Sequence, residues 1–426
     1  MNRSNIFFSV GLLAGVIFAA QAGAESLEDV FLVGKDATPP GPAFKKPDVG
    51  ESYVDQVTGR TITRVSKAGG GRFNRNTYSR RQAENADGTM FFTYHGSAEY
   101  HVYDAATMKR IRRLTVEPEA ELQWHPADPD LIRHTTGVNS YAGSLKLLET
   151  NVRTGKKREI VDLSNRLPWE KANPGFGYSG FLTDGAEGSP SADGNRYAWL
   201  VVDRDENLVG LVTYDLATDT ILGTMDLDEQ EEIDSVSMSP SGRYVIVSGD
   251  EVLAYDADLT NPRTVAETSE HSDIGIGRDQ SDWYLHVDYE SNDGDVFAIN
   301  LDTMEKIVMF SLYDGDATAS THVSGKAFDK PGWAVISTYF PRSEEYRWTH
   351  DKVFLVSFDP ARDEQVILNI AHTRNCAESY WTEPHAVPNR QLSRIYYNSN
   401  WGSCEFDAEV YRAEVPPVPE LEETRR

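Results

Sequence analysis

The chain has 426 residues and a formal net charge of −26 at pH 7. This acidity argues against nucleic acid and against an anionic membrane surface as partners, and it is typical of an exported protein. Because about 400 residues exceed what one hydrophobic core supports, we expect either two domains or a repeat array.

The first 24 residues are typical of a secretory signal peptide. Arg3 precedes an apolar run over residues 6–20, and small residues at 22–24 lead to Glu25. An apolar run of about fifteen residues is too short to cross a bilayer. We therefore expect a cleaved leader, no membrane insertion, and a protein that is periplasmic or secreted.

The rest of the chain divides into three parts by composition. Residues 25–50 are rich in Pro, Gly and Lys and predict an irregular lead. Residues 416–426 predict a disordered tail. Residues 51–415 between them contain the periodic patterns, so the folded structure is expected there.

A short signature recurs seven times in this folded part. It consists of a strand that turns from polar to apolar, a turn of the Asp-Gly kind, and an apolar strand. The copies cover residues 80–95, 121–136, 187–202, 234–249, 271–287, 322–338 and 384–399. A second strand, turn and strand follow most copies, and no long window has helical periodicity.

Four short strands repeated seven times predict an all-β fold, a seven-bladed β-propeller. Residues 52–66 carry the second signature without the first, whereas the last copy ends at 409–415 without an outer strand. The N-terminal strand is therefore expected to complete the last blade and close the ring. A two-domain all-β protein is the alternative.

Three histidines occupy equivalent places in successive repeats. His271, His322 and His385 each lie near the start of the strand that lines the central channel. Neutral imidazoles that converge at a polar channel mouth can bind a divalent transition metal. The further candidate ligands, by position in their repeats, are Asp273, Glu383 and Gln123. The alternative is that each histidine only bonds to a neighbouring blade.

Other polar side chains are candidates for chemistry on a substrate. Arg80 and Arg81 begin the inner strand of the first repeat and could pair with a carboxylate, unless they are solvated surface arginines. Tyr78 could act as an acid or base, and His134 opens a loop that could reach substrate. Trp381 is the best candidate for stacking on a sugar ring.

Absent catalytic motifs and the number of cysteines limit the classes of protein that this chain can belong to. The sequence has no GxSxG, GxxxxGK[ST] or HExxH motif, which argues against a serine hydrolase, an NTPase and a helix-borne zinc protease. Cys376 and Cys404 are the two cysteines, and in an exported chain we expect them to pair. The alternative is two buried thiols.

Several phrases resemble a known family. LQWHPADPDLI and SVSMSPSGRYVIV resemble repeats of bacterial exported propellers, and EPHAVPN with RIYYNSNWG is similar to the last blade of oligogalacturonate lyases. The resemblance implies a manganese-type ion held by histidines and a glutamine, and β-elimination of acidic oligosaccharides. His385 matches the second histidine of the family's close pair, Glu383 replaces the first, and His322 and His271 match by blade position.

The expected function is therefore an exported lyase that cleaves an acidic oligo- or polysaccharide with the help of a divalent metal, of the manganese type or zinc. The metal or the Arg80 and Arg81 pair would neutralise the uronate carboxylate, and Arg81, Tyr78 or His134 would take the C5 proton. The rival is a non-catalytic propeller that binds a glycan or a partner protein through its face. A glycoside hydrolase is a weaker possibility, because no pair of carboxylates stands out.

Overall fold

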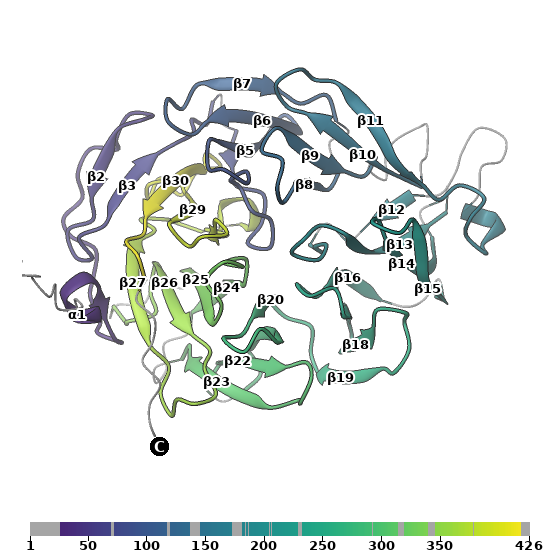
Figure 1. Cartoon of the computed structure of the whole chain (residues 1–426). Coiled ribbons are helices and arrows are strands. Elements are labelled where there is room, and N and C mark those ends of the chain that lie inside the picture. Colours follow the sequence, from purple (N-terminus) through teal and green to yellow (C-terminus); the bar gives the residue numbers. More distant parts are fainter. Residues whose placement is uncertain are drawn as a thin grey trace, which may run out of the picture.

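The protein is described by a computed structural model and folds into a ring of β-blades (Figure 1). The structure describes residues 26–418 except 70–71, 117–119, 137–144, 173–180, 184, 186, 204, 206, 229–231, 292, 314–318, 340–345 and 378. The expected signal peptide and the residues from 419 onward lie outside these ranges. Within the described ranges, none of the helices is long and apolar enough to cross a bilayer.

The first three blades follow the chain. Blade 1 contains β4 (Asn74–Arg75), β5 (Met90–His95), β6 (Glu99–Asp104) and β7 (Arg110–Arg113). Blade 2 contains β8 (Leu122–Trp124), β9 (Leu131–His134), β10 (Lys146–Asn151) and β11 (Lys157–Asp162). Blade 3 contains β12 (Phe181–Thr183), β13 (Arg196–Val202), β14 (Leu208–Asp215) and β15 (Thr220–Asp226), preceded by the short 3-10 helix η1 (Glu170–Ala172).

The next three blades have the same antiparallel order. Blade 4 contains β16 (Ile233–Met238), β17 (Tyr244–Gly249), β18 (Val252–Asp256) and β19 (Arg263–Ala266). Blade 5 contains β20 (Ser272–Ile276), β21 (Asp282–Asp288), β22 (Asp295–Asn300) and β23 (Lys306–Ser311). Blade 6 contains β24 (Ser320–Ser324), β25 (Trp333–Tyr339), β26 (Lys352–Ser357) and β27 (Ile367–His372). The first strands of these blades, β16, β20 and β24, lie toward the centre of the ring (Figure 1).

Blade 7 closes the ring with strands from both ends of the chain. It combines β28 (Val387–Pro388), β29 (Arg394–Ser399) and β30 (Glu409–Glu414) with β3 (Thr61–Arg64) and β2 (Ser52–Val54). In the antiparallel pairing of β3 with β30, Thr63 lies opposite Arg412. The prediction of a seven-bladed propeller whose last blade is completed by an N-terminal strand is therefore confirmed.

The N-terminal segment that precedes β2 packs on blade 6. It contains the one-turn helix α1 (Leu27–Val30) and the strand β1 (Leu32–Val33), which pairs with β27. Phe31, which lies between these two elements in the sequence, is buried in an apolar cluster that also contains Val418, near the C-terminal end of the chain.

Glycines in the tight turns after the inner strands explain the recurrent signature. Gly88, Gly194 and Gly242 have φ between 65° and 74°, the left-handed region that glycine adopts without steric cost. Each donates its N–H to a carbonyl three residues earlier, from Asn85, Ser191 and Ser239 respectively. This turn allows the chain to reverse direction into the second strand of the blade.

The hydrophobic core is divided among the seams between blades. Seven buried clusters are present among the described residues, and each joins two neighbouring blades. The cluster between blades 5 and 6, for example, includes Trp283 and Leu285 on one side and Ile336 and Phe354 on the other. Several small cores thus replace the one large core that a chain of this length would not form.

A buried carboxylate at the closing seam links blade 7 to the N-terminal segment. Glu409 Oε1 lies 2.7 Å from Arg64 Nη2, and Glu409 Oε2 lies 2.7 Å from Lys46 Nζ. The backbone N–H of Ala68 also donates to Glu409 Oε1 at 2.9 Å. Both Glu409 and Arg64 are buried, so removal of one partner leaves the other charge without compensation.

We predict that Glu409→Ala lowers the free energy of unfolding by about 3–5 kcal/mol, because it leaves the Arg64 guanidinium buried without its carboxylate. Guanidinium denaturation measures this change. The matched control is Asp130→Ala, which removes the exposed ion pair with Arg153 and should cost less than about 1 kcal/mol. Equal losses in the two variants would contradict a special role for the seam.

Candidate functional site

Two histidines and a glutamate meet at one mouth of the channel. His322 lies in β24, and Glu383 and His385 lie just before β28 in the next blade. Glu383 Oε2 accepts hydrogen bonds from His322 Nε2 at 2.8 Å and from His385 Nε2 at 3.2 Å. One ligand atom from each residue falls within 4.8 Å of the other two. We call this set the His-Glu trio.

The backbone around His385 holds its side chain close to the other two residues of the trio. His385 has φ of 41°, an uncommon conformation for a residue with a side chain. The flanking backbone is fixed on both sides, because Asn398 N–H donates to Pro384 O at 2.7 Å and Asn76 Nδ2 donates to His385 O at 2.9 Å. Strain of this kind is typical of functional sites, where the surrounding structure compensates for it.

Burial sets the charge state of the trio. Desolvation lowers the pKa of His322 and of His385 to about 4, so both imidazoles are neutral at physiological pH. Burial alone would raise the pKa of Glu383, but hydrogen bonds from His322 and His385 outweigh it and hold this pKa well below its usual range. Neutral imidazoles with an ionised carboxylate are the state in which these side chains bind metal.

The trio fits a divalent transition metal by its donor set. Two imidazole nitrogens and one carboxylate oxygen match the three protein ligands of many catalytic sites, which leave a position open for water or substrate. In addition, His322 Nδ1 is buried without a hydrogen-bond partner among the described residues. Glu383 and His385 from blade 7 and His322 from blade 6 are therefore the residues that would hold the ion.

His271 lies beside the trio but outside it. Its ring centroid is 4.2 Å from that of His322. Its Nδ1 lies 2.8 Å from Thr321 O and 3.3 Å from the Tyr289 hydroxyl, so Nδ1 carries the proton and Nε2 is left with a lone pair. Burial and, to a smaller extent, the nearby His322 lower the pKa of His271 to about 3. His271 is thus a neutral base at the channel mouth.

His271 also borders an open hollow of about 650 Å³. Tyr380 lines the hollow on the trio side. The carboxylates that line it are Glu187, Glu232, Asp234, Asp250 and Glu270. The side of the site that faces blades 3 to 5 is therefore acidic.

Tyr78 packs against both imidazoles of the trio. Its ring centroid lies 5.5 Å from that of His322 and 5.0 Å from that of His385, in edge-on contacts. Burial raises the pKa of Tyr78 well above its usual value, so the phenol keeps its proton. The structure thus brings Tyr78, one of the residues proposed from sequence, to the trio.

Arg80 is buried beside Tyr78, with its guanidinium carbon 5.6 Å from the ring centroid, and its donors are already engaged. Its Nη2 donates to Ser272 Oγ at 2.9 Å, its Nη1 donates to Ser235 Oγ at 3.2 Å, and its Nε donates to the Ser272 carbonyl. The Nη1 atom also lies 3.6 Å from a carboxylate oxygen of Glu187. Arg81 is only 4% exposed, so neither arginine is a solvated surface residue.

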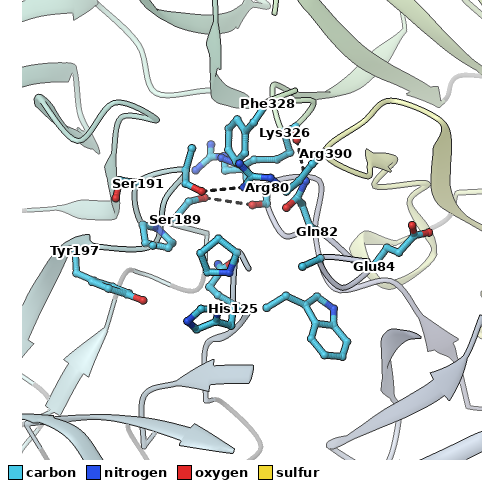
Figure 2. Close-up of a pocket in the computed structure, with 17 residues that line it drawn as sticks. Arg80, Gln82, Glu84, His125, Ser189, Ser191, Tyr197, Lys326, Phe328 and Arg390 are labelled. Carbon is cyan, nitrogen blue, oxygen red and sulfur yellow. Dashed lines mark hydrogen bonds between the residues drawn. The ribbon is translucent and has the colours of Figure 1, made fainter. Parts of the chain in front are cut away.

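Two other predicted residues lie away from the trio. His134 is buried inside blade 2, where Nδ1 contacts Thr135 O at 2.8 Å and Nε2 contacts Thr150 Oγ1 at 2.9 Å. Gln123 lines a small hollow of about 40 Å³ toward the other end of the inner strands. Arg80 and Lys326 border the same hollow (Figure 2). Neither residue joins the trio in this structure.

Trp381 lies at the surface next to the trio. Its ring stacks on Phe73 with a centroid distance of 5.1 Å and an interplanar angle of 6°. The side chain is 37% exposed, so a ligand can reach it. Its position therefore permits the sugar-stacking role predicted from sequence.

Sequence reasoning missed Arg75, Tyr339 and Tyr380. Arg75 Nη1 lies 3.1 Å from His385 Nδ1, and its charge contributes to the low pKa of that histidine. Tyr339 stacks on His322 at 5.3 Å, and the Tyr380 ring lies 5.0 Å from that of His385. Arg75 lies in the short inner strand of blade 1, before the first residue that the repeat signature covers, so no sequence signal marked it.

A disulfide braces the segment that carries Glu383 and His385. Cys376 and Cys404 are bonded, with Cα atoms 4.9 Å apart, which confirms the predicted pair. Asn400 supports the same turn, because Cys376 N–H donates to its Oδ1 at 2.9 Å and its Nδ2 donates to Cys376 O at 2.8 Å.

Comparison with solved structures supports the fold. The chain is similar to an oligogalacturonate lyase in complex with manganese and to the oligogalacturonate lyase of Vibrio parahaemolyticus. Each is 14% identical, with a TM-score of 0.58, over 86% of this chain and 96% of the other. No family model and no curated protein matches the sequence. At this identity the likeness shows a shared fold, and it confirms the resemblance noted in the sequence.

We predict that the protein binds a single manganese or zinc ion, and that His322→Gln combined with His385→Gln lowers the affinity by more than about 100-fold, because two of three ligands are lost. Elemental analysis after dialysis measures the retained metal. The control His125→Gln, on a turn at the other end of the inner strands, should retain it. Full retention by the double variant, with an unchanged circular dichroism spectrum, would contradict the assignment.

Proposed function

We propose that the protein is an exported lyase that cleaves an acidic oligo- or polysaccharide by metal-assisted β-elimination. The observation that carries this proposal is the His-Glu trio at the channel mouth, with His271 beside it. The propeller fold shared with oligogalacturonate lyases and the presence of a disulfide, which is typical of exported proteins, support it. Periplasmic or secreted location rests on the leader at residues 1–24.

The first requirement of the reaction is to make the uronate C5 proton acidic. His322, His385 and Glu383 would hold a divalent metal, which would supply Lewis-acid stabilisation of the substrate carboxylate. The buried Arg75 guanidinium adds positive charge behind His385, at the place where negative charge develops on the substrate. Arg80 contributes charge from a distance, since its donors are engaged with the protein.

The second requirement is a base and an acid. His271 accepts the C5 proton at Nε2, because its Nδ1–H is held by Thr321 O. We assign it this role instead of that of a fourth ligand. The C5–H electron pair forms the C4–C5 double bond, and the bond from C4 to the glycosidic oxygen breaks. Tyr78, which keeps its phenolic proton, donates it to the leaving oxygen.

A glycan-binding propeller without catalysis is the second candidate. The burial of Arg80 and Arg81 favours this candidate. The sequence predicted that these two arginines pair with a substrate carboxylate, but both are buried and the donors of Arg80 are already engaged. The acidic hollow beside His271 also disfavours a uronate on that side of the site. The two candidates differ in whether an unsaturated product forms.

We predict that the manganese-loaded or zinc-loaded protein produces ultraviolet-absorbing unsaturated uronates from at least one member of a panel of pectic, alginate and ulvan-type substrates. His271→Asn should lower kcat by about 10²–10⁴-fold, because the base is lost, while the metal content stays unchanged. His125→Asn is the matched control. No product from any substrate with either metal would overturn the lyase and favour the binding module.

A further inference from the structure

Three exposed aromatic rings gather beside the trio. Tyr380, Trp381 and Phe406 are 41%, 37% and 43% exposed, and they are the large aromatic side chains that remain exposed among the described residues. Phe73 connects them, with centroids 5.1 Å from Trp381 and 5.3 Å from Phe406. Tyr380 lies 5.5 Å from Trp381. We call these four residues the aromatic platform.

The platform is continuous with the candidate active site. The Tyr380 ring contacts His385 and also lines the hollow that His271 borders. Trp381 precedes Glu383 by two residues. A molecule seated over the trio therefore has the platform as its neighbour on the side of blades 7 and 1.

The platform is held rigidly before any ligand arrives. The 3-10 helix η2 (Tyr380–Thr382) is fixed by Asn375 Nδ2, which donates to Thr382 O at 2.5 Å. The disulfide from Cys376 to Cys404 ties this segment to the one that carries Phe406. Below the rings, the buried Arg75 guanidinium lies 4.9–5.6 Å from the centroids of Phe73, Tyr380 and Trp381.

The indole N–H of Trp381 is a donor that no described residue accepts. Trp124, Trp283 and Trp401 all donate their ring N–H to protein oxygens. The Trp381 N–H makes no hydrogen bond to the described part of the chain, and the side chain reaches solvent. A flat apolar surface beside a free N–H donor matches the apolar face and the hydroxyl groups of a pyranose ring.

The area of the platform suits a sugar better than a protein. An aromatic side chain offers about 150–250 Å², so three rings that are about two-fifths exposed present roughly 200–300 Å². A stable protein interface needs about 800 Å² per partner. The opposite side of the site is lined by five carboxylates, so an acidic chain is repelled there and extends toward the platform.

From these observations we propose that the aromatic platform is a second sugar subsite, which stacks the pyranose ring adjacent to the residue held at the trio. The inference rests on the proposed function and adds that the sugar ring next to the one held at the trio is recognised through Trp381. Stacking depends on the apolar ring face, so this subsite accepts a neutral sugar as well as a uronate.

The test uses the full-length protein stripped of metal with EDTA, so that stacking is measured apart from catalysis. Isothermal titration with a galacturonate trisaccharide and with a neutral glucose trisaccharide should show binding of both. Trp381→Ala should weaken binding about three- to tenfold, the range expected for loss of one aromatic contact. Trp381→Phe should retain most of it. Val308→Ala, at another exposed apolar residue, should bind like the wild type.

Unchanged binding by Trp381→Ala, with an intact circular dichroism spectrum, would overturn the subsite, and so would the absence of binding by the stripped wild type. A shift from dimer to monomer in Trp381→Ala would instead identify the platform as a contact between copies of the chain, which also overturns it. The lyase proposal is tested separately by product formation. If binding depends on Trp381 but no unsaturated product forms, the lyase proposal is wrong and the subsite is still supported.

Discussion

Closure of the ring by β3 on β30 is the constraint on which the site depends. The pairing fixes the N-terminal segment against blade 7, and the chain then passes directly into β4 of blade 1. Asn76 N–H donates to Asn398 Oδ1 at 2.7 Å across this seam. Arg75 and Tyr78 are placed against His385 by the same arrangement, so an open ring would separate them from the trio.

Burial is the second factor that shapes the site. Fully exposed imidazoles would be partly protonated near neutral pH, whereas His322 and His385 are kept neutral because their charged forms are poorly solvated. Burial alone would raise the pKa of Glu383, and hydrogen bonds and charge interactions with the two histidines outweigh it and keep Glu383 ionised. The three residues are therefore mutually dependent, and each stabilises the state of the others that favours a cation.

The sequence was sufficient for the fold because the repeat signature follows from local physics. Strand pairs around a tight turn recur at each copy, and four of the seven turns have a glycine with positive φ, so seven blades and the displaced N-terminal strand are readable from spacing alone. The blade position of a residue also follows, which is why His322 and His385 could be predicted to converge. The spacing does not give the height of a residue along the channel or the direction of its side chain. A register shift of one residue turns a side chain to the other face of the strand.

Gln123 and His134 illustrate that limit. Gln123 occupies an inner strand as expected, yet it faces a hollow toward the other end of the channel. His134 lies at the end of the second strand of its blade and is engaged there by Thr135 and Thr150. Arg75 was missed for the converse reason, since its strand has only two residues and carries no turn signal of its own.

The interior of the channel determines from which end a ligand can reach the trio. Asp273, another candidate ligand from the sequence, is buried and paired with Lys326 Nζ at 2.8 Å, and it accepts the N–H of Gly325 at 2.7 Å. Arg80 crosses beside this pair to Ser272 and Ser235. These buried charged groups are held by hydrogen bonds and ion pairs, so moving them aside would expose uncompensated charge. A ligand of the trio must therefore approach from the mouth where the trio, the acidic hollow and the aromatic platform lie, and the proposed sugar substrate would contact these three surfaces.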